Sequence, residues 1–158
     1  MHRIGFGTDI HRLVTGRPLI IGGVRIESDL GADGHSDADV LMHAAADAVL
    51  GALALGDLGM HFPNDEPRWR DAESSQFLRY AVELIKGKGY SVANIDSVVD
   101  LESPKLRPYI DAMRTNLAAA LDVDIEFVSV KAKTGESVDA VGEKCAIRAQ
   151  AIVLLVKA

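Results

Sequence analysis

The chain has 158 residues, of which 48% are hydrophobic and 25% charged, and a formal net charge of −6. This length suffices for a real hydrophobic core, so we expect residues 1–158 to form a single domain. The negative charge argues against a nucleic-acid-binding surface, because such surfaces bind mainly by neutralising phosphates with Lys and Arg. A small anionic ligand, held by a metal ion and a few amides, is compatible with it.

Three features indicate the compartment. Cys145 is the one cysteine, which excludes an intramolecular disulfide, and nothing points to an oxidising environment. The first residues, MHRIGFG, enter a strand pattern directly and do not resemble a signal or transit peptide. No apolar run approaches the roughly 20 residues that span a bilayer. We therefore expect a cytoplasmic protein that binds neither nucleic acid nor membrane.

Hydrophobic periodicity divides the chain into strands and helices. In chain order the expected elements are strands at 3–11 and 17–26, helices at 37–56 and 72–86, a strand at 90–101, a helix at 105–121, and strands at 128–134 and 144–157. Gly22-Gly23 marks a bend in the first part. This order predicts an α+β fold, an α/β sandwich with a mixed four- to five-stranded sheet and its helices packed on one face.

The first expected helix has recognisable ends. Ser36 is placed to cap it, and Asp37 and Asp39 would lie in its first turn, where the helix dipole favours carboxylates. Gly56 can end it. His35 and Ser36 would then lie at the helix N-terminus, where free N–H groups favour an anion such as a phosphate.

Apolar positions predict which side chains form the core. Those expected there are Phe77, Leu78, Ala81, Leu84, Ile85, Ile95, Val99, Leu101, Leu106, Ile110, Met113, Leu117 and Leu121, with Ile4, Phe6, Ile10 and Leu13 available from the first strand. The other sheet face would carry Asn94, Asp96, Asp100, Lys131, Lys133, Arg148, Gln150, Ile152, Leu154 and Val156. A partly apolar second face needs cover, and self-association would provide it.

Asp9 and His11 share one face of the first strand, because strand side chains alternate. On the first helix, His43 lies four residues from both Asp39 and Asp47, on one stripe. A strand packed beside this helix would bring His43 to Asp9 and His11. Two imidazoles and a carboxylate suit Zn²⁺ and leave a fourth position open, and Asp39 or Asp47 could fix a histidine tautomer. The alternative is a set of solvated polar residues on an edge strand and a helix surface.

Three further stretches place polar groups at the ends of elements, and each alone is a weak signal: LGDLG (55–59), ESPKL (102–106) and KAKTGE (131–136). Asp57 could equally be a turn residue, Lys105 a solvated lysine and Thr134 a strand-end hydroxyl.

Taken together, these stretches resemble the 2-C-methyl-D-erythritol 2,4-cyclodiphosphate synthase family of the non-mevalonate isoprenoid pathway. The specific pattern is D-x-H, then H-S-D-x-D, with a histidine eight residues after the first histidine of that motif. The resemblance covers almost the whole chain, from RIGFGTDIHRL to AIVLLVK.

The resemblance implies roles for individual residues. Asp9, His11 and His43 would hold a zinc ion, and Glu136 a second ion, Mg²⁺ or Mn²⁺. His35 and Thr134 would be catalytic, positioning and stabilising the phosphates. The substrate-binding residues would be Asp9, His11, His35, Ser36, Asp57, Gly59, Phe62, Asp65, Leu101, Pro104, Lys105, Leu106, Lys133, Thr134 and Glu136, with Asp57 and Gly59 at the ribose and residues 101–107 around the cytidine phosphate.

The implied reaction converts 4-diphosphocytidyl-2-C-methyl-D-erythritol 2-phosphate to the cyclic diphosphate and releases CMP. The substrate's own 2-phosphate is the nucleophile, so Cys145 need not be catalytic, and the loop at 62–71 is a candidate lid. The family is a homotrimer with active sites between adjacent subunits. Two alternatives are a zinc-dependent phosphohydrolase and a non-enzymatic isoprenoid-binding trimer.

The chain departs from the family pattern at several positions. Ala38 replaces a common glycine, which we expect to be harmless in a helix, and Asn64 puts a usual carboxylate contact in doubt. The stretch at 136–143, ESVDAVGE, is about two residues shorter than the common G-R-G-E ending and has Val141 nearest the arginine position. We expect Lys133 to take over part of that cationic role, and isoprenoid diphosphate binding in the trimer cavity to be weak or lost.

Overall fold

The computed structural model describes residues 1–63 and 65–158; Asn64, where a carboxylate contact was in doubt, lies outside them. The strands are β1 (His2–Thr15), β2 (Leu19–Ile21), β3 (Val24–Ile26), β4 (Leu30–Ala32), β5 (Tyr90–Asp100), β6 (Val128–Lys133) and β7 (Ala146–Lys157). The helices are α1 (Val40–Ala52), α2 (Leu58–His61), α3 (Ser75–Gly87), α4 (Ile110–Leu121) and α5 (Asp139–Gly142), with 3₁₀ turns at Pro67–Trp69, Arg107–Tyr109 and Ile125–Phe127.

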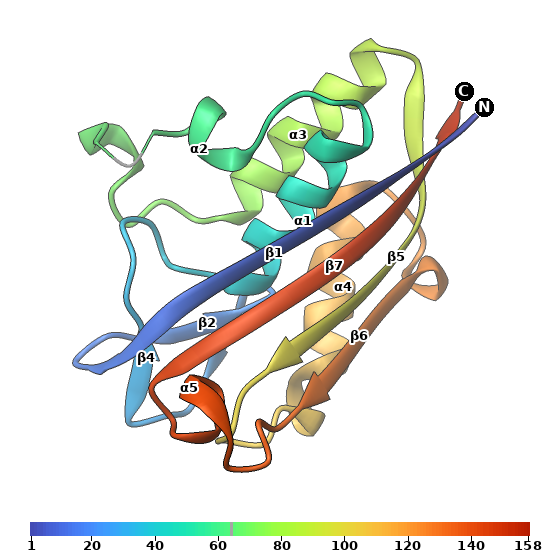
Figure 1. The fold of residues 1–158 in the computed structure, drawn as a ribbon. Coiled ribbons are helices and arrows are strands. Elements are labelled where there is room, and N and C mark those ends of the chain that lie inside the picture. Colours follow the sequence, from blue (N-terminus) through green and yellow to red (C-terminus); the bar gives the residue numbers. More distant parts are fainter. Residues whose placement is uncertain (64) are drawn as a thin grey trace.

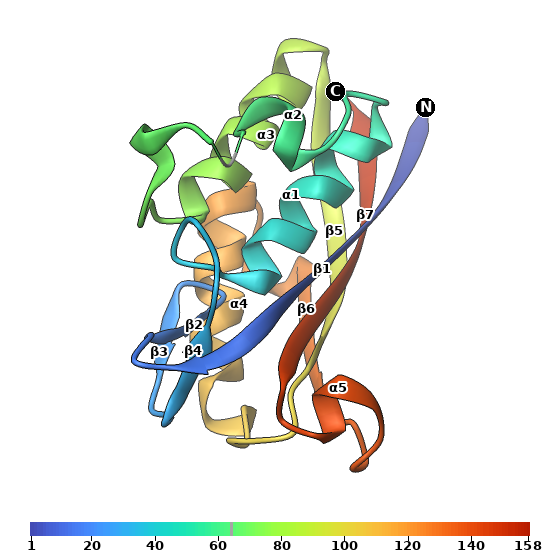
Figure 2. The ribbon, with the colours of Figure 1, turned by 60° about the vertical axis from the view of Figure 1, so that its left-hand side comes forward.

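A five-stranded sheet in the order β4-β1-β7-β5-β6 forms one layer of the molecule (Figure 1). The long strands β1 and β7 pair antiparallel from His2 opposite Val156 to Arg12 opposite Ala146. Strand β7 also pairs antiparallel with β5, whereas β5 and β6 are parallel. Helices α1, α3 and α4 lie on one side of this sheet (Figure 2). The predicted mixed sheet with helices on one face is confirmed.

The expected strand at 17–26 is a hairpin of two short strands, β2 and β3, which form a sheet of their own. Gly22 and Gly23 make its turn with φ values of +57° and +71°. Glycine populates this left-handed region without steric cost, which explains its presence at both positions.

Helix α1 packs directly against β1 because both elements present small groups to each other. A Cβ atom on Gly7 would lie only 2.1 Å from the carbonyl oxygen of Ala44, and one on Gly5 only 1.8 Å from that of Ala48. Neither glycine can therefore be replaced without moving the helix. This close approach is what brings the polar residues of α1 to those of β1.

The alternation of β1 corrects one expectation about the core. Gly5, Gly7, Asp9 and His11 face α1, so Ile4, Phe6 and Ile10 point to the opposite side, with 72%, 59% and 54% of their surface exposed. Only Leu13, of the four apolar residues expected from this strand, is in the core.

The side of the sheet away from the helices, here called the outer sheet face, is partly apolar as predicted. Phe6 lies opposite Ile152, which is 51% exposed, and Ile4 lies opposite Leu154. Near the start of β7, Arg148 binds Asp100 at 3.1 Å and Asp139 at 3.2 Å.

The start of α1 differs from the prediction. Asp39, not Ser36, is the N-cap, and its Oδ1 accepts a hydrogen bond from the Met42 amide at 3.1 Å. Ala38 therefore lies before the helix, in the left-handed region with φ of +56°. The expectation that Ala38 is a harmless helical residue is wrong, and a glycine would adopt this backbone more easily.

Smaller differences concern helix boundaries and faces. Helix α1 ends before Gly56, at a Leu53 C-cap. On α3, Val82 is buried in place of Leu84. The remaining core positions of α3, β5 and α4 are buried as expected, apart from the partly exposed Ile110. None of the helices in the described residues has the length and apolar character needed to cross a membrane.

Candidate metal site and nucleotide pocket

Asp9 and His11 on β1 and His43 on α1 form one cluster, as the sequence predicts. Asp9 Oδ2 lies 2.9 Å from His11 Nε2 and 2.9 Å from His43 Nδ1, and the two nitrogens are 3.3 Å apart. Ligands at about 2.0 Å from a tetrahedral zinc ion are about 3.3 Å from one another. The three atoms are therefore spaced for one small divalent ion.

Each imidazole is held from its other nitrogen. His11 Nδ1 lies 2.9 Å from the carbonyl oxygen of Asp33. His43 Nε2 lies 2.7 Å from Ser74 Oγ, and the Ser74 hydroxyl in turn donates to Asp37. A hydrogen bond from one ring nitrogen leaves the lone pair of the other free for a metal, which is the usual arrangement around a ligating histidine.

The structure assigns Asp39 and Asp47 other roles than the predicted one of orienting a histidine. Asp39 is fully buried and accepts from the Gly22 and Gly23 amides at 2.9 and 2.6 Å, so it ties the β2–β3 turn to α1. Asp47 accepts from the Leu58 amide at 2.7 Å and holds the start of α2. In the described residues, the imidazoles are instead held by Asp33, Ser36 and Ser74.

The charges of the cluster are mutually stabilised. Burial works to raise the pKa of Asp9, but hydrogen bonds from His11 and His43 outweigh it and lower that pKa to about 2. Burial likewise opposes protonation of His11, but the bond to Asp9 prevails and raises the His11 pKa. A divalent cation would take the place of this imidazolium charge beside the Asp9 carboxylate.

These observations fit a metal ion. The set offers two imidazole nitrogens and one carboxylate oxygen, which are typical zinc ligands in sites that keep an open position. The side chains of His43, His11 and Asp9 are 12%, 16% and 26% exposed, so the cluster is partly covered but reachable from solvent.

His35 and Ser36 lie beside the cluster, but not at a helix N-terminus. Asp39 caps α1 and accepts from the Met42 amide, so Ser36 is not the cap, and the anion site expected beside His35 and Ser36 stays a prediction. Ser36 is buried, and its Oγ lies 3.3 Å from His43 Nε2. His35 Nε2 contacts the carbonyl oxygen of Glu66 at 3.3 Å, so His35 adjoins the expected lid.

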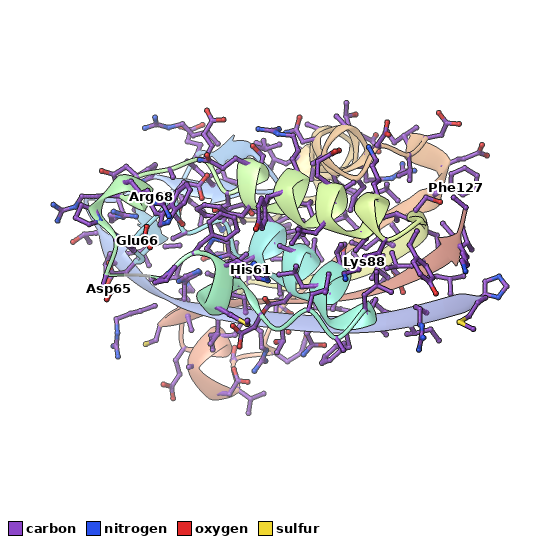
Figure 3. The ribbon with its side chains drawn as sticks, turned by 90° about the horizontal axis from the view of Figure 1, so that it is seen from above. His61, Asp65, Glu66, Arg68, Lys88 and Phe127 are labelled. Atoms are coloured by element: carbon purple, nitrogen blue, oxygen red, sulfur yellow. The ribbon has the colours of Figure 1, made fainter. Side chains whose placement is uncertain are left out.

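The expected lid at 62–71 is anchored by aromatic packing in its described part. The Phe62 ring centroid lies 5.0 Å from that of Trp69 and 4.4 Å from that of Phe77 on α3. Figure 3 shows Asp65, Glu66 and Arg68 together at one end of the molecule, far from Lys88 and Phe127. Asp65 is exposed there, and the substrate contacts expected of Phe62 and Asp65 stay predictions.

Asp57 and Gly59, predicted at the ribose, lie at α2. Asp57 is the N-cap of this helix, and its Oδ1 accepts from the Met60 amide at 2.9 Å. Asp57 thus has a structural role at the start of α2, close to the turn role given above as the alternative. The ligand contacts expected of its other carboxylate oxygen and of the exposed Gly59 stay predictions.

The residues predicted around the cytidine phosphate line one cavity of about 470 Å³, within the usual size range of ligand pockets. Its walls come from the segment that follows β5, from the start of α4 and from β6 and the residue after it, and they include Leu101, Pro104, Lys105, Leu106, Lys133 and Thr134. The adjoining turn is held by Glu102, which accepts from the Gly135 amide at 2.8 Å, and Thr134 donates to Glu136 at 2.6 Å.

Within one chain, this cavity and the metal cluster are apart. Asp9 pairs with Ala149 on β7, which pairs with Val99 on β5, which pairs with Ala132 on β6. Three strand spacings of about 4.8 Å place the two ends of this row about 14 Å from each other. The predicted metal and nucleotide residues thus form two groups in the subunit, with two strands between them.

Comparison with known proteins identifies the family. The profile of the YgbB family matches residues 2–156. The chain belongs to the YgbB family. Among curated relatives, 2-C-methyl-D-erythritol 2,4-cyclodiphosphate synthase from Salinibacter ruber is 57% identical over 149 residues, which are 94% of this chain and 95% of the relative. The synthase of the same name from Synechococcus elongatus is 51% identical over 155 residues, 98% of this chain and 97% of the relative.

Solved structures agree with this family. A CDP-bound 2C-methyl-D-erythritol-2,4-cyclodiphosphate synthase has 40% identity and a TM-score of 0.90 over 98% of this chain and all of that one. The CDP complex of IspF from Plasmodium falciparum has 36% identity and a TM-score of 0.87, covering 99% and 96%. In the bifunctional IspDF from Campylobacter jejuni, this chain matches 43% of the length, with a TM-score of 0.96 and 36% identity.

Two residues at the metal cluster were not recognised in the sequence as part of it. Asp37 was expected in the first turn of the first helix, and Ser74 lies inside the segment expected as the second helix, 72–86. The signal available for Asp37 was its place inside the motif H-S-D-A-D. For Ser74 the sequence offers none, because its contact with His43 spans 31 residues.

Proposed function

We propose that the protein is a 2-C-methyl-D-erythritol 2,4-cyclodiphosphate synthase, which converts 4-diphosphocytidyl-2-C-methyl-D-erythritol 2-phosphate to the cyclic diphosphate and CMP. The reaction makes it a cyclising phosphorus–oxygen lyase. One observation carries the proposal: the open cluster of Asp9, His11 and His43 lies in a YgbB chain that is 57% identical to a relative of that name over nearly all of its length.

In this proposal Asp9, His11 and His43 hold one zinc ion per subunit, and Glu136 holds Mg²⁺ or Mn²⁺ together with the substrate. When bound, these ions supply Lewis-acid stabilisation of the negative charge that gathers as one phosphate approaches another. The spacing of the three zinc ligands and their exposure to solvent support the first part. The exposed position of Glu136 beside Thr134 supports the second.

The chain's own residues would mainly bind and orient the substrate. The cavity at residues 101–107 takes the cytidine phosphate, while His35 and Thr134 position the phosphates. Holding both ends of a flexible molecule for an intramolecular attack can contribute ~7–11 kcal/mol. The attacking group is the substrate's own 2-phosphate, so no protein nucleophile is required. Residues 62–71 would exclude water, which otherwise competes with ring closure.

We further propose a homotrimer in the cytoplasm, with each active site between two subunits. The outer sheet face supports association, because Phe6, Ile10 and Ile152 expose apolar surface that a neighbouring copy can cover. The distance of about 14 Å between metal cluster and nucleotide cavity within a subunit supports a shared site. A neighbouring subunit could supply the missing half at closer range.

Product analysis tests the function. With substrate and Zn²⁺ and Mg²⁺, we expect ³¹P NMR to show the cyclic diphosphate and CMP without inorganic phosphate. Inorganic phosphate as the main product would instead identify a phosphohydrolase. His43→Ala should abolish CMP release, because it removes a zinc ligand; no CMP release from the wild-type trimer, with an unchanged result for His43→Ala, would identify a non-enzymatic binding protein.

The altered stretch at 136–143 leads to two predictions. Val141 is buried and carries no charge. The positive charge of the nearby Arg148 is paired with Asp100 and Asp139. Lys133 lines the nucleotide cavity and is exposed, which supports its taking part of the missing arginine's role. Lys133→Ala should therefore impair the kinetics, and unchanged kinetics would contradict this. Isoprenoid diphosphate binding should be weak; tight binding of farnesyl diphosphate by the purified protein would contradict that.

A further inference from the structure

Ser74 lies at the N-cap of α3 but does not cap it. Serine at this position usually accepts a hydrogen bond from an amide of the first helical turn. Here the backbone of Ser74 is already helical, with φ of −64°, and its side chain makes no capping bond. The hydroxyl is fully buried and points instead to His43 Nε2, at 2.7 Å. Its position needs a reason other than helix capping.

Asp37 holds Ser74 at two points. One carboxylate oxygen accepts from the Ser74 hydroxyl, and the other accepts from the Ser74 amide at 3.0 Å. A carboxylate has only acceptors to offer, so the hydroxyl proton of Ser74 is directed to Asp37. Ser74 Oγ is then left with lone pairs toward His43, and the Nε2–H of His43 donates to it.

This hydrogen bond also determines the state of the other ring nitrogen of His43, Nδ1. When Nε2 carries the proton, Nδ1 of the neutral imidazole has a free lone pair. That Nδ1 is the atom 2.9 Å from Asp9 Oδ2 and 3.3 Å from His11 Nε2. The lone pair therefore points to the place where the three predicted ligands converge.

We propose that Asp37 and Ser74 position His43 as a metal ligand, by selecting its Nε2–H tautomer and fixing the plane of its ring. The inference rests on the metal site proposed above. The inference also implies that the two histidines are oriented by different kinds of group. His11 is oriented by the backbone carbonyl of Asp33, which no substitution removes, whereas His43 Nε2 contacts the side-chain oxygens of Ser74, at 2.7 Å, and Ser36, at 3.3 Å.

Zinc affinity tests this directly, by competition between the metal-free protein and a chromophoric chelator. Ser74→Ala removes the nearer acceptor for Nε2–H and leaves Ser36 Oγ at 3.3 Å, and we expect zinc to bind 10- to 100-fold more weakly. Asp37→Asn keeps the shape but replaces one acceptor by a donor. The amide and the hydroxyl of Ser74 can then no longer both donate to residue 37. The hydroxyl instead donates to His43 Nε2 and favours the tautomer that is protonated at Nδ1. We expect a similar loss of affinity from this variant.

Ser75→Ala is the matched control, because it makes the same chemical change one residue further along α3. It should bind zinc within twofold of the wild type. The visible absorption of the Co²⁺-loaded protein gives a second readout, since its bands report ligand geometry. They should change in Ser74→Ala and stay the same in Ser75→Ala. Urea unfolding of the metal-free variants shows whether each is folded, and Asp37→Asn decides if Ser74→Ala is not.

The results separate this inference from the proposed function. If the wild type binds zinc and both variants bind it within twofold of the wild type, the positioning role is wrong and the metal site stands. The same holds if Ser75→Ala weakens binding as much as Ser74→Ala does. If the wild type itself binds no zinc, the metal site is wrong, and the positioning role fails with it.

Discussion

Replacing Gly7 by alanine should separate α1 from β1. The added Cβ would lie 2.1 Å from Ala44 O and 2.6 Å from Ala48 N, both backbone atoms of the helix. An ordinary contact begins near 3.4 Å, so the helix must move by about 1.3 Å to admit the methyl group. Backbone cannot rotate away as a flexible side chain would.

The expected cost follows from this overlap. Overpacking a well-packed core by one or two carbons typically costs about 1–3 kcal/mol. Because the overlap is with the helix backbone, we expect Gly7→Ala to lie at the upper end, about 3 kcal/mol. The same displacement carries His43 away from Asp9 and His11. Metal ligands must lie within about 0.2 Å of their proper distance, so zinc affinity should fall as well.

Urea unfolding and zinc competition measure both effects. Gly51→Ala is the control, because it makes the same change on the facing helix, where the nearest atom, Phe6 O, is 3.9 Å away. That variant should be neutral or more stable by up to about 1 kcal/mol, since alanine is the better helix former. If Gly7→Ala is destabilised by less than 1 kcal/mol and keeps its zinc affinity, the argument that glycine permits the contact is wrong.

Three further predictions concern the backbone, the charges and the assembly. Ala38→Gly should change the free energy of unfolding by less than about 1 kcal/mol, because relief of the left-handed backbone offsets the lost methyl group; Ala44→Gly, inside α1, should cost more, and equal losses in urea unfolding would contradict this. In the metal-free protein, the lowered pKa of Asp9, about 2, adds about 2 kcal/mol of stability that is present above pH 3.8 and lost as the pH falls toward 2. The raised pKa of His11 adds stability that is fully present below pH 6.5 and is lost as the pH rises above 6.5 and through the raised pKa of the folded state. Unfolding experiments from pH 2 to 9 should show both losses in the wild type and neither in Asp9→Asn, and a flat wild-type profile would refute the ion pair. Phe6→Asp should reduce the proposed trimer to smaller species in sedimentation experiments, because it places a charge on the outer sheet face; an intact trimer would exclude this face as the interface.

Local patterns in the sequence were enough to predict the main secondary structure and the cluster of Asp9, His11 and His43, which could hold a metal ion. Alternation places Asp9 and His11 on the same side of a strand whatever lies around them. The alanines of the first helix likewise indicate a close approach to the sheet. The resemblance to the family predicted the remaining candidate residues, and several of them line the cavity at residues 101–107.

The sequence alone could not decide which face of β1 meets the core. Glycine has no side chain to count as apolar, so Ile4, Phe6 and Ile10 looked like the buried set and Gly5 and Gly7 did not. Only the packing of α1, whose backbone approaches too closely for any Cβ, reverses that choice. The same limit applies to Asp39 and Ala38, where capping at Asp39 starts the helix later and leaves Ala38 with a positive φ.

Local sequence thus determined what each element is, because helix and strand periodicity depend on neighbours within a few residues. Tertiary structure decided what the polar side chains do. Asp37, Ser74 and His43 come from three separate segments, and their hydrogen bonds exist only after α1 and α3 have packed together. Contacts between distant segments depend on the whole fold, so they cannot be predicted from short stretches of sequence.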